Sequence, residues 1–227
     1  MKRINLSFII AVILITALFS ISTASANGDG KLDEILNNMQ RSAASINTIY
    51  ARMEQLKRDR SIGGTEKYSG ELFFKHAGKN NDKVRINYSV PNGQIIWVVG
   101  DEITLYQANI KQAIKTTRSS AASKSEEFSF AATPYTSVPE LKRQYNIVYS
   151  GEDQSMAKLD LTPKAKSSVQ KLTLWVDQST WLPMKYHITE SNGNDTTFIL
   201  SNVKKNSVIP DGNFKVNLPG GTKIVRK

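Results

Sequence analysis

Few side chains in this sequence could carry out covalent chemistry. The 227 residues include two histidines and no cysteine, which removes thiolate nucleophiles, disulfide bonds and cysteine-ligated metals. Neither His76 nor His187 stands in a metal-ligand spacing such as H-E-x-x-H. Glu126 and Glu127 could form a general acid and base pair, but adjacent carboxylates in a polar stretch are more typical of a solvated face. We therefore predict a protein that is not an enzyme and that uses no metal or cofactor.

The sequence therefore favours a binding function over catalysis. The charge of the chain helps to indicate which kind of partner it binds. No G-x-x-x-x-G-K-[ST] loop or G-x-S-x-G elbow occurs, so neither nucleotide hydrolysis nor serine-hydrolase chemistry is indicated. The formal net charge is +10, but the basic residues are dispersed among acidic ones, with small clusters such as Lys204-Lys205. We expect no nucleic-acid partner. Anionic headgroups or an acidic patch on a membrane protein suit such a surface better, although solubility alone would also explain the charge.

Residues 1–26 have the three parts of a secretory signal peptide. Lys2 and Arg3 supply the positive start, residues 6–19 are almost entirely apolar, and Ala24-Ser25-Ala26 supplies small residues before a cut. The apolar run is shorter than the roughly 20 residues that span a bilayer. We expect residues 27–227 to form one exported domain, with a formal net charge of +8 after Lys2 and Arg3 are removed.

The first mature segment has the spacing of an amphipathic helix. Over residues 29–44 the apolar side chains recur every three or four positions, on one face: Leu32, Ile35, Leu36, Met39 and Ala43. Residues 45–56 are ambiguous. Their apolar side chains could prolong the helix, whereas the polar stretch 45–48 favours a break followed by a strand.

After Gly63-Gly64 the apolar period changes from helical spacing to two. The alternating or apolar segments are 72–75, 84–90, 95–99, 103–106, 145–149, 156–161, 169–176, 184–189, 196–200 and 214–218. Short turns such as Asn92-Gly93 and Gly100-Asp101 join several of them, which indicates antiparallel neighbours. About ten strands are enough for a large curved antiparallel sheet or barrel.

Residues 116–144 separate the two blocks of strands. Small polar residues fill positions 119–125, and three aromatic side chains follow without periodicity: Phe128, Phe130 and Tyr135. Ser137 and Glu140 have the spacing of a capping box that opens a short helix through Gln144. The segment is either a mobile lid over an apolar cleft or a surface connection whose aromatic rings fill the edge of the core.

Short motifs follow one another in a set order along the mature chain. They include 70–75 (GELFFK), 84–88 (VRINY), 100–106 (GDEITLY), 172–177 (LTLWVD) and 218–221 (LPGG). Each motif is weak alone, but their order and spacing resemble the periplasmic outer-membrane lipoprotein carrier family, LolA. The resemblance covers essentially the whole mature chain.

The resemblance implies an α+β, mainly antiparallel fold: an unclosed β-barrel with a helical lid over an apolar cavity. Residues 49–58 become the first strand in this setting. With strand alternation, the expected cavity lining is Leu72, Phe74, Val84, Ile86, Tyr88 and Leu105, and the expected lid aromatics are Phe128, Phe130 and Tyr135. Members of the family receive acylated lipoproteins from an ATP-driven inner-membrane transporter and pass them to an outer-membrane receptor. We therefore expect a monomeric periplasmic carrier.

One departure from the family concerns the lid. The family typically has a Lys-Arg-Pro run after the first complete strand, and its Arg helps to hold the lid. This chain has Lys75-His76-Ala77, so His76 is the candidate latch, or an ordinary residue at a strand end. Two other functions remain open: a lipid-sensing regulatory or receptor module on the same fold, and a protein-binding envelope module with a closed core.

Overall fold

A single open sheet forms the body of the protein. The computed structural model describes residues 24–226 except 79–80, 91–92 and 122–136. In this part of the chain the strands are β1 (Thr48–Asp59), β2 (Gly64–Lys75), β3 (Lys83–Val90), β4 (Gln94–Val99), β5 (Glu102–Gln107), β6 (Gln112–Thr117), β7 (Tyr145–Asp153), β8 (Met156–Pro163), β9 (Val169–Asp177), β10 (Pro183–Glu190), β11 (Asp195–Lys205) and β12 (Lys223–Arg226). Their order across the sheet is β12-β6-β5-β4-β3-β2-β1-β11-β10-β9-β8-β7.

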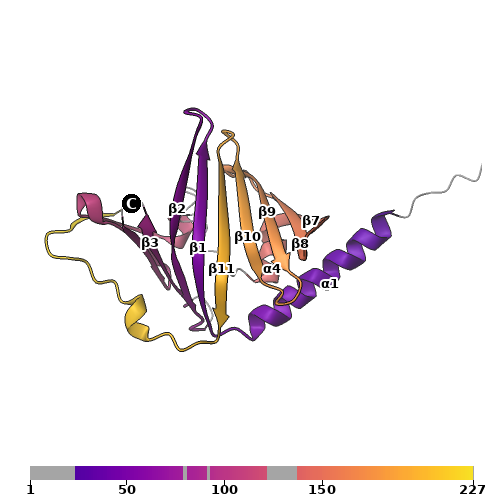
Figure 1. The fold of residues 1–227 in the computed structure, drawn as a ribbon, viewed down its shortest axis with the longest axis horizontal. Helices are drawn as coiled ribbons and strands as arrows, with labels where there is room; N and C mark the ends of the chain where they lie inside the picture. The colour runs from indigo at the N-terminus through magenta and orange to yellow at the C-terminus, as the bar shows by residue number, and fades with distance from the viewer. Residues whose placement is uncertain (1–23, 79–80, 91–92, 122–136, 227) are drawn as a thin grey trace, which may run out of the picture.

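The sheet is antiparallel at every pairing except that of β12 with β6, which is parallel. β7 and β12 form its two edges, so the barrel does not close (Figure 1). Short helical elements complete the described chain: α1 (Ala24–Ala44), η1 (Ala108–Ile110), α2 (Arg118–Ala121), α4 (Val138–Gln144) and η2 (Asp211–Phe214). The predicted fold class, an unclosed and mainly antiparallel sheet with helices, is therefore confirmed.

α1 ends at Ala44, and the ambiguous segment that follows is a strand. The Asn206 side chain fastens this turn, because its amide donates to the Ser45 carbonyl at 2.9 Å and accepts from the Asn47 N–H at 2.8 Å. β1 then pairs with β2 on one side and β11 on the other, which makes it a central strand. Backbone pairing on both sides outweighs the helical spacing of its apolar residues. In the described chain, no helix is long and apolar enough to cross a bilayer.

Strand alternation divides the sheet into two faces. The inner face is the one covered by α1 and α4, whose buried Ile35, Leu36, Val138 and Leu141 join its core cluster. The outer face carries a second, smaller cluster of Trp97, Tyr106 and Ala113. In Figure 1, α1 runs beside the β7–β10 half of the sheet and the yellow C-terminal segment beside the other half.

The C-terminal segment corrects one prediction. Residues 214–218 were expected to be a strand, and this is wrong: η2 ends at Phe214, and no strand follows until β12. Val216 and Leu218 alternate because they pack onto the outer cluster, not because they pair in the sheet. β6 and β12 were not predicted, because QAIKTT and KIVR are short and largely polar.

The predicted helix before β7 is confirmed as α4, but its capping box is not. Ser137 makes no side-chain capping hydrogen bond at the N-terminus of this helix. Glu140 does not reach back to the cap either, since its carboxylate accepts hydrogen bonds from Arg143 and from Gln144. Pro139 in the first turn is the part of the motif that is consistent with the helix start.

Candidate functional site

The six side chains predicted to line a cavity all lie on the inner face. Five are buried and Leu105 is half-buried, and all belong to or pack against one core cluster: Leu72, Phe74, Val84, Ile86, Tyr88 and Leu105. The register explains why they meet. Leu72 lies opposite Ile86, and Ile86 lies opposite Ile96 on the next strand. Antiparallel pairing therefore turns separate alternating segments into one apolar surface.

The helices cover this surface mainly through apolar contacts. α1 contacts β7 and α4, and its Ile35 and Leu36 are almost fully buried. One hydrogen bond ties α1 to the turn after β9, from Ser42 Oγ to the Thr180 carbonyl at 2.7 Å. The ion pair between Lys142 and Asp33 joins the two helices to each other, at 3.5 Å and exposed. Burial of apolar area, rather than polar bonding, thus holds the cover on the inner face.

Two polar side chains on the inner face were missed by the sequence analysis. Gln55 is only 1% exposed, and within the described structure its Nε2 has no hydrogen-bond partner. The Oγ1 of buried Thr116, on β6, is also without a partner there. Alternation of Ile49, Ala51 and Met53 was the signal that could have placed Gln55 on this face. Buried donors without partners cost free energy.

The predicted lid aromatics Phe128, Phe130 and Tyr135 lie outside the described residues. The flanking helices α2 and α4 are described, and they place the two ends of this segment. α2 follows β6 directly and contacts β5 and β6, whereas α4 packs against α1 and β7. These two helices therefore lie at opposite halves of the sheet.

His76 lies at the end of β2 with an exposed side chain. Its Nδ1 is 2.7 Å from Oδ1 of Asp82, and its backbone N–H donates to the Asn47 carbonyl at 2.8 Å. The assignment of His76 as a latch stays a prediction, because its expected partners lie in the undescribed segment. The sequence did not indicate that Asp82 would be its carboxylate partner.

Arg118, at the start of α2, lies close to the same loop. Its guanidinium donates to the Gly100 carbonyl at 2.8 Å and to the Asp82 carbonyl at 3.2 Å. Burial lowers the pKa of Arg118, and the carboxylates of Asp82 and Asp101 oppose this effect. Asp82 thus bonds both His76, through its carboxylate, and Arg118, through its backbone. The sequence analysis did not single out Arg118 as a site residue.

The remaining candidate for chemistry is His187, which lies on the outer face. Its Nδ1 is 2.9 Å from Thr197 Oγ1 on the neighbouring strand, and burial lowers its pKa. Among the residues that the structure describes, no group of three His, Asp or Glu side chains could hold a metal ion. The inner face therefore remains the candidate site. This face is a continuous apolar surface of the open sheet, covered by α1 and α4.

Comparison with known proteins identifies the family. Residues 44–217 match the model of the family described as outer membrane lipoprotein carrier protein LolA. This match spans most of the chain, so the protein belongs to the LolA family. The predicted family is thereby confirmed, and membership of a family of carrier proteins confirms that the chain is not an enzyme.

Individual relatives are distant but cover the chain well. An outer-membrane lipoprotein carrier protein of Pseudomonas entomophila (strain L48) is 25% identical over 226 residues, covering 96% of this chain and 99% of the relative. A second carrier, from Chromobacterium violaceum, is 24% identical over 164 residues, covering 72% of this chain and 74% of the relative. An uncharacterized conserved protein of Thermus thermophilus has the same fold, with a TM-score of 0.55 and 12% identity over 87% of this chain and 99% of that protein.

Proposed function

We propose that the protein is a periplasmic carrier that shields the acyl chains of lipoproteins against the inner face of its sheet. In this proposal residues 1–26 direct export and are cleaved, and residues 27–227 work as a monomer. An ATP-driven inner-membrane transporter loads the cargo and an outer-membrane receptor accepts it. Two relatives named as outer-membrane lipoprotein carriers support this assignment.

The observation that carries the proposal is the continuous apolar inner face under a cover held mainly by burial. Three acyl chains of about 16 carbons expose roughly 45 methylenes, and at about 0.8 kcal/mol each their exposure to water costs on the order of 36 kcal/mol. A protein that carries such chains through water needs a large apolar surface. The surface has to be covered when it is empty, because an exposed apolar patch promotes association.

The cover also has to move when cargo enters. Helices that rest on apolar side chains can shift without breaking the backbone hydrogen bonds between strands. Aromatic side chains of the lid (Phe128, Phe130 and Tyr135) can occupy the apolar face in the empty protein and leave it on loading. We place the hinge of this lid at Arg118, where a half-buried guanidinium bonded to two loop carbonyls gives the segment a fixed end.

Transfer of cargo is the experiment that tests the proposal. The purified mature protein is loaded with a fluorescent triacylated lipopeptide and mixed with acceptor vesicles that carry the outer-membrane receptor. We expect a soluble one-to-one complex and delivery without added nucleotide. Stable binding without delivery would instead indicate a lipid sensor, and absence of binding would indicate a module with a closed core.

A further inference from the structure

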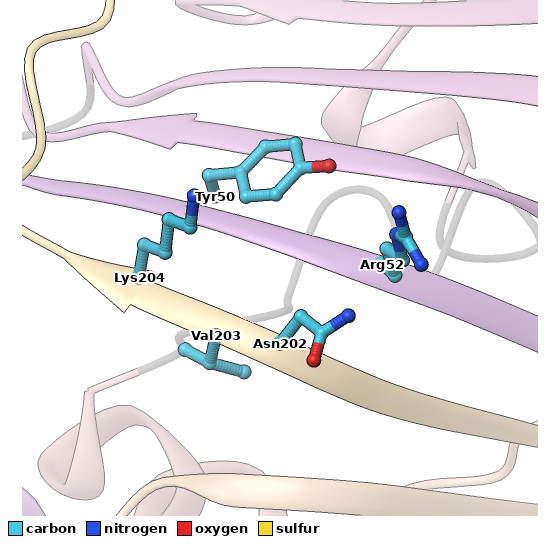
Figure 2. A pocket seen from close by; sticks show the side chains of 5 residues that line it. All are labelled: Tyr50, Arg52, Asn202, Val203 and Lys204. Atoms are coloured by element: carbon cyan, nitrogen blue, oxygen red, sulfur yellow. The ribbon is translucent and has the colours of Figure 1, made fainter.

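A hollow on the outer face of the sheet lies opposite the proposed acyl site. It has a volume of about 300 Å³ and lies where β1 meets β11. Figure 2 shows the side chains that line it: Tyr50, Arg52, Asn202, Val203 and Lys204. Two of these five residues are cations, one is an amide and none is a carboxylate. This composition suits an anion.

An irregularity in strand pairing builds the hollow. The register between β1 and β11 shifts after Tyr50, so that Tyr50 faces Lys204 whereas Arg52 faces Ser201. Without the extra residue in β11, Lys204 would lie opposite Ile49, on the apolar inner face. The bulge therefore moves the Lys204 ammonium to the outer face, beside Tyr50 and Arg52. Bulges that redirect a side chain are common next to functional sites.

Asn202 lies at the extra position of this bulge. Its φ of 50° lies in the left-handed region, which asparagine tolerates better than most other side chains. Val203 next to it packs toward the inner core. In Figure 2 the Asn202 amide lies on the same side of the sheet as Arg52. β11 therefore has an unfavoured backbone conformation at Asn202, the residue whose amide lines the hollow together with the two cations.

The Glu71 carboxylate is hydrogen-bonded to one of the side chains that line the hollow. Glu71 lies opposite Arg52 on β2, and its Oε1 accepts a hydrogen bond from the Tyr50 hydroxyl at 2.8 Å. This bond raises the pKa of Tyr50, so the phenol stays protonated and adds no negative charge to the hollow. Lys204 Nζ lies 5.8 Å from the centre of the Tyr50 ring, which is a cation–π distance.

We propose that this hollow binds one phosphate group, either free in solution or in the headgroup of an anionic phospholipid. Arg52, Lys204 and Asn202 all line the hollow, and a tetrahedral phosphate has an oxygen for each of them, whereas a carboxylate has only two. The formal net charge of the mature chain, +10 less the two charges of Lys2 and Arg3, is positive and favours encounter with either source. The site lies on the face opposite the acyl surface, so its occupation does not depend on the proposed carrier function.

The sharpest test places a carboxylate inside the hollow. Asn202→Asp keeps the side-chain size and a residue that tolerates positive φ, but its charge neutralises one of the two cations. Asn146→Asp adds the same charge at an exposed position of β7 and is the matched control. Binding of the full mature chain is measured by calorimetry with inorganic phosphate, and by cosedimentation with phosphatidylcholine vesicles with and without phosphatidylglycerol.

We expect Asn202→Asp to weaken binding at least about tenfold and Asn146→Asp to change it less than about twofold. Binding to phosphatidylglycerol vesicles alone would identify the headgroup as the source, and binding of phosphate alone would identify the free ion. If the wild-type protein binds neither probe, or if the two variants bind equally, the proposal is wrong.

A second pair of variants guards against misfolding of the first. Arg52→Gln with Lys204→Gln removes both cations from the hollow, whereas Arg41→Gln with Lys205→Gln removes two exposed cations that do not line it. Both double variants lower the net charge equally, so a general charge effect would weaken both alike. We expect the loss of binding only in the first pair, and an equal loss in both would overturn the site.

Discussion

The sheet buries an apolar cluster on each face, and the two clusters are covered in different ways. On the inner face, α1 and α4 lie over the core with few polar ties in the described structure, among them the bond from Ser42 to the Thr180 carbonyl. On the outer face, the C-terminal segment is fixed to the sheet through its backbone. β12 pairs with β6, and Arg85 donates to the Asn213 carbonyl at 3.0 Å.

Ion pairs add to the attachment of the outer cover. The Asp211 carboxylate accepts from Lys75 at 3.1 Å and from Lys83 at 3.2 Å, on neighbouring strands. Such a cover cannot leave without breaking directional bonds, whereas the inner cover can shift and keep its apolar contacts. This difference supports the proposal that the outer cluster serves stability and that ligand binds on the inner face.

The largest expected effect is that of a charge on the inner face. Ile86 is fully buried, so Ile86→Glu should cost at least about 3 kcal/mol of stability and abolish binding of a triacylated lipopeptide. Asn87→Glu is the matched control, because the next residue of the strand points to the outer face. Its effect on both readouts, thermal unfolding and fluorescence binding, should be small. Equal effects of the two substitutions would refute the face assignment.

The next largest effect separates the two clusters. Trp97 is almost fully buried under the C-terminal segment, so Trp97→Ala should cost about 3 kcal/mol in chemical denaturation. Lipopeptide affinity should stay within about twofold, because the outer cluster does not face the ligand. Trp175→Ala is the control on the same face, since that half-buried ring lies beneath Lys185 and should cost less. A large loss of affinity in Trp97→Ala would mean that the two faces are coupled.

The same contrast explains how much the sequence could predict. Period-two alternation placed Leu72, Phe74 and Ile86 on one face correctly, because side chains that are buried on one side of a strand recur at every second residue. It failed at residues 214–218, where Val216 and Leu218 alternate as a cover and not as a strand. Alternation reports which side chains are buried and not what buries them. The pairing of β12 with β6 depends on backbone hydrogen bonds. Such pairing produces no clear alternation of apolar side chains in short segments, so the sequence does not reveal it.

Gln55 is another place where local patterns are insufficient. Alternation with Ile49, Ala51 and Met53 could have placed Gln55 on the apolar face, but only the three-dimensional structure shows that its Nε2 has no partner among the described residues. Gln55→Leu should therefore raise stability by about 1 kcal/mol, because it removes a buried donor.

The same substitution should weaken lipopeptide binding about three- to tenfold if the amide donates to an acyl carbonyl of the ligand. Thermal unfolding and fluorescence titration measure the two effects. Gln170→Leu, at an exposed position of β9, is the control and should change neither. Higher stability with unchanged affinity would mean that Gln55 makes no contact with ligand.

The smallest expected effect concerns acid and the outer cover. Hydrogen bonds from Lys75 and Lys83 hold the pKa of Asp211 below its ordinary value. A carboxylate with a lowered pKa stabilises the folded state above its ordinary pKa of about 4, and this contribution is lost as the pH falls through the lowered value. Asp211 is fully exposed, so solvent screening keeps the effect small.

Acid should therefore loosen the C-terminal segment before it affects the inner cover. The methyl resonances of Val216 report on the outer cover and those of Ile35 on the inner one, and both can be followed by NMR from pH 6 to 3. We expect Val216 to shift first and Ile35 to stay constant over the same range. In Asp211→Asn the Val216 resonance should already resemble the acid form at pH 6, because the ion pairs are absent at every pH. Simultaneous shifts of Val216 and Ile35 would mean that acid acts through general unfolding, and the separate attachment of the outer cover would then have no support.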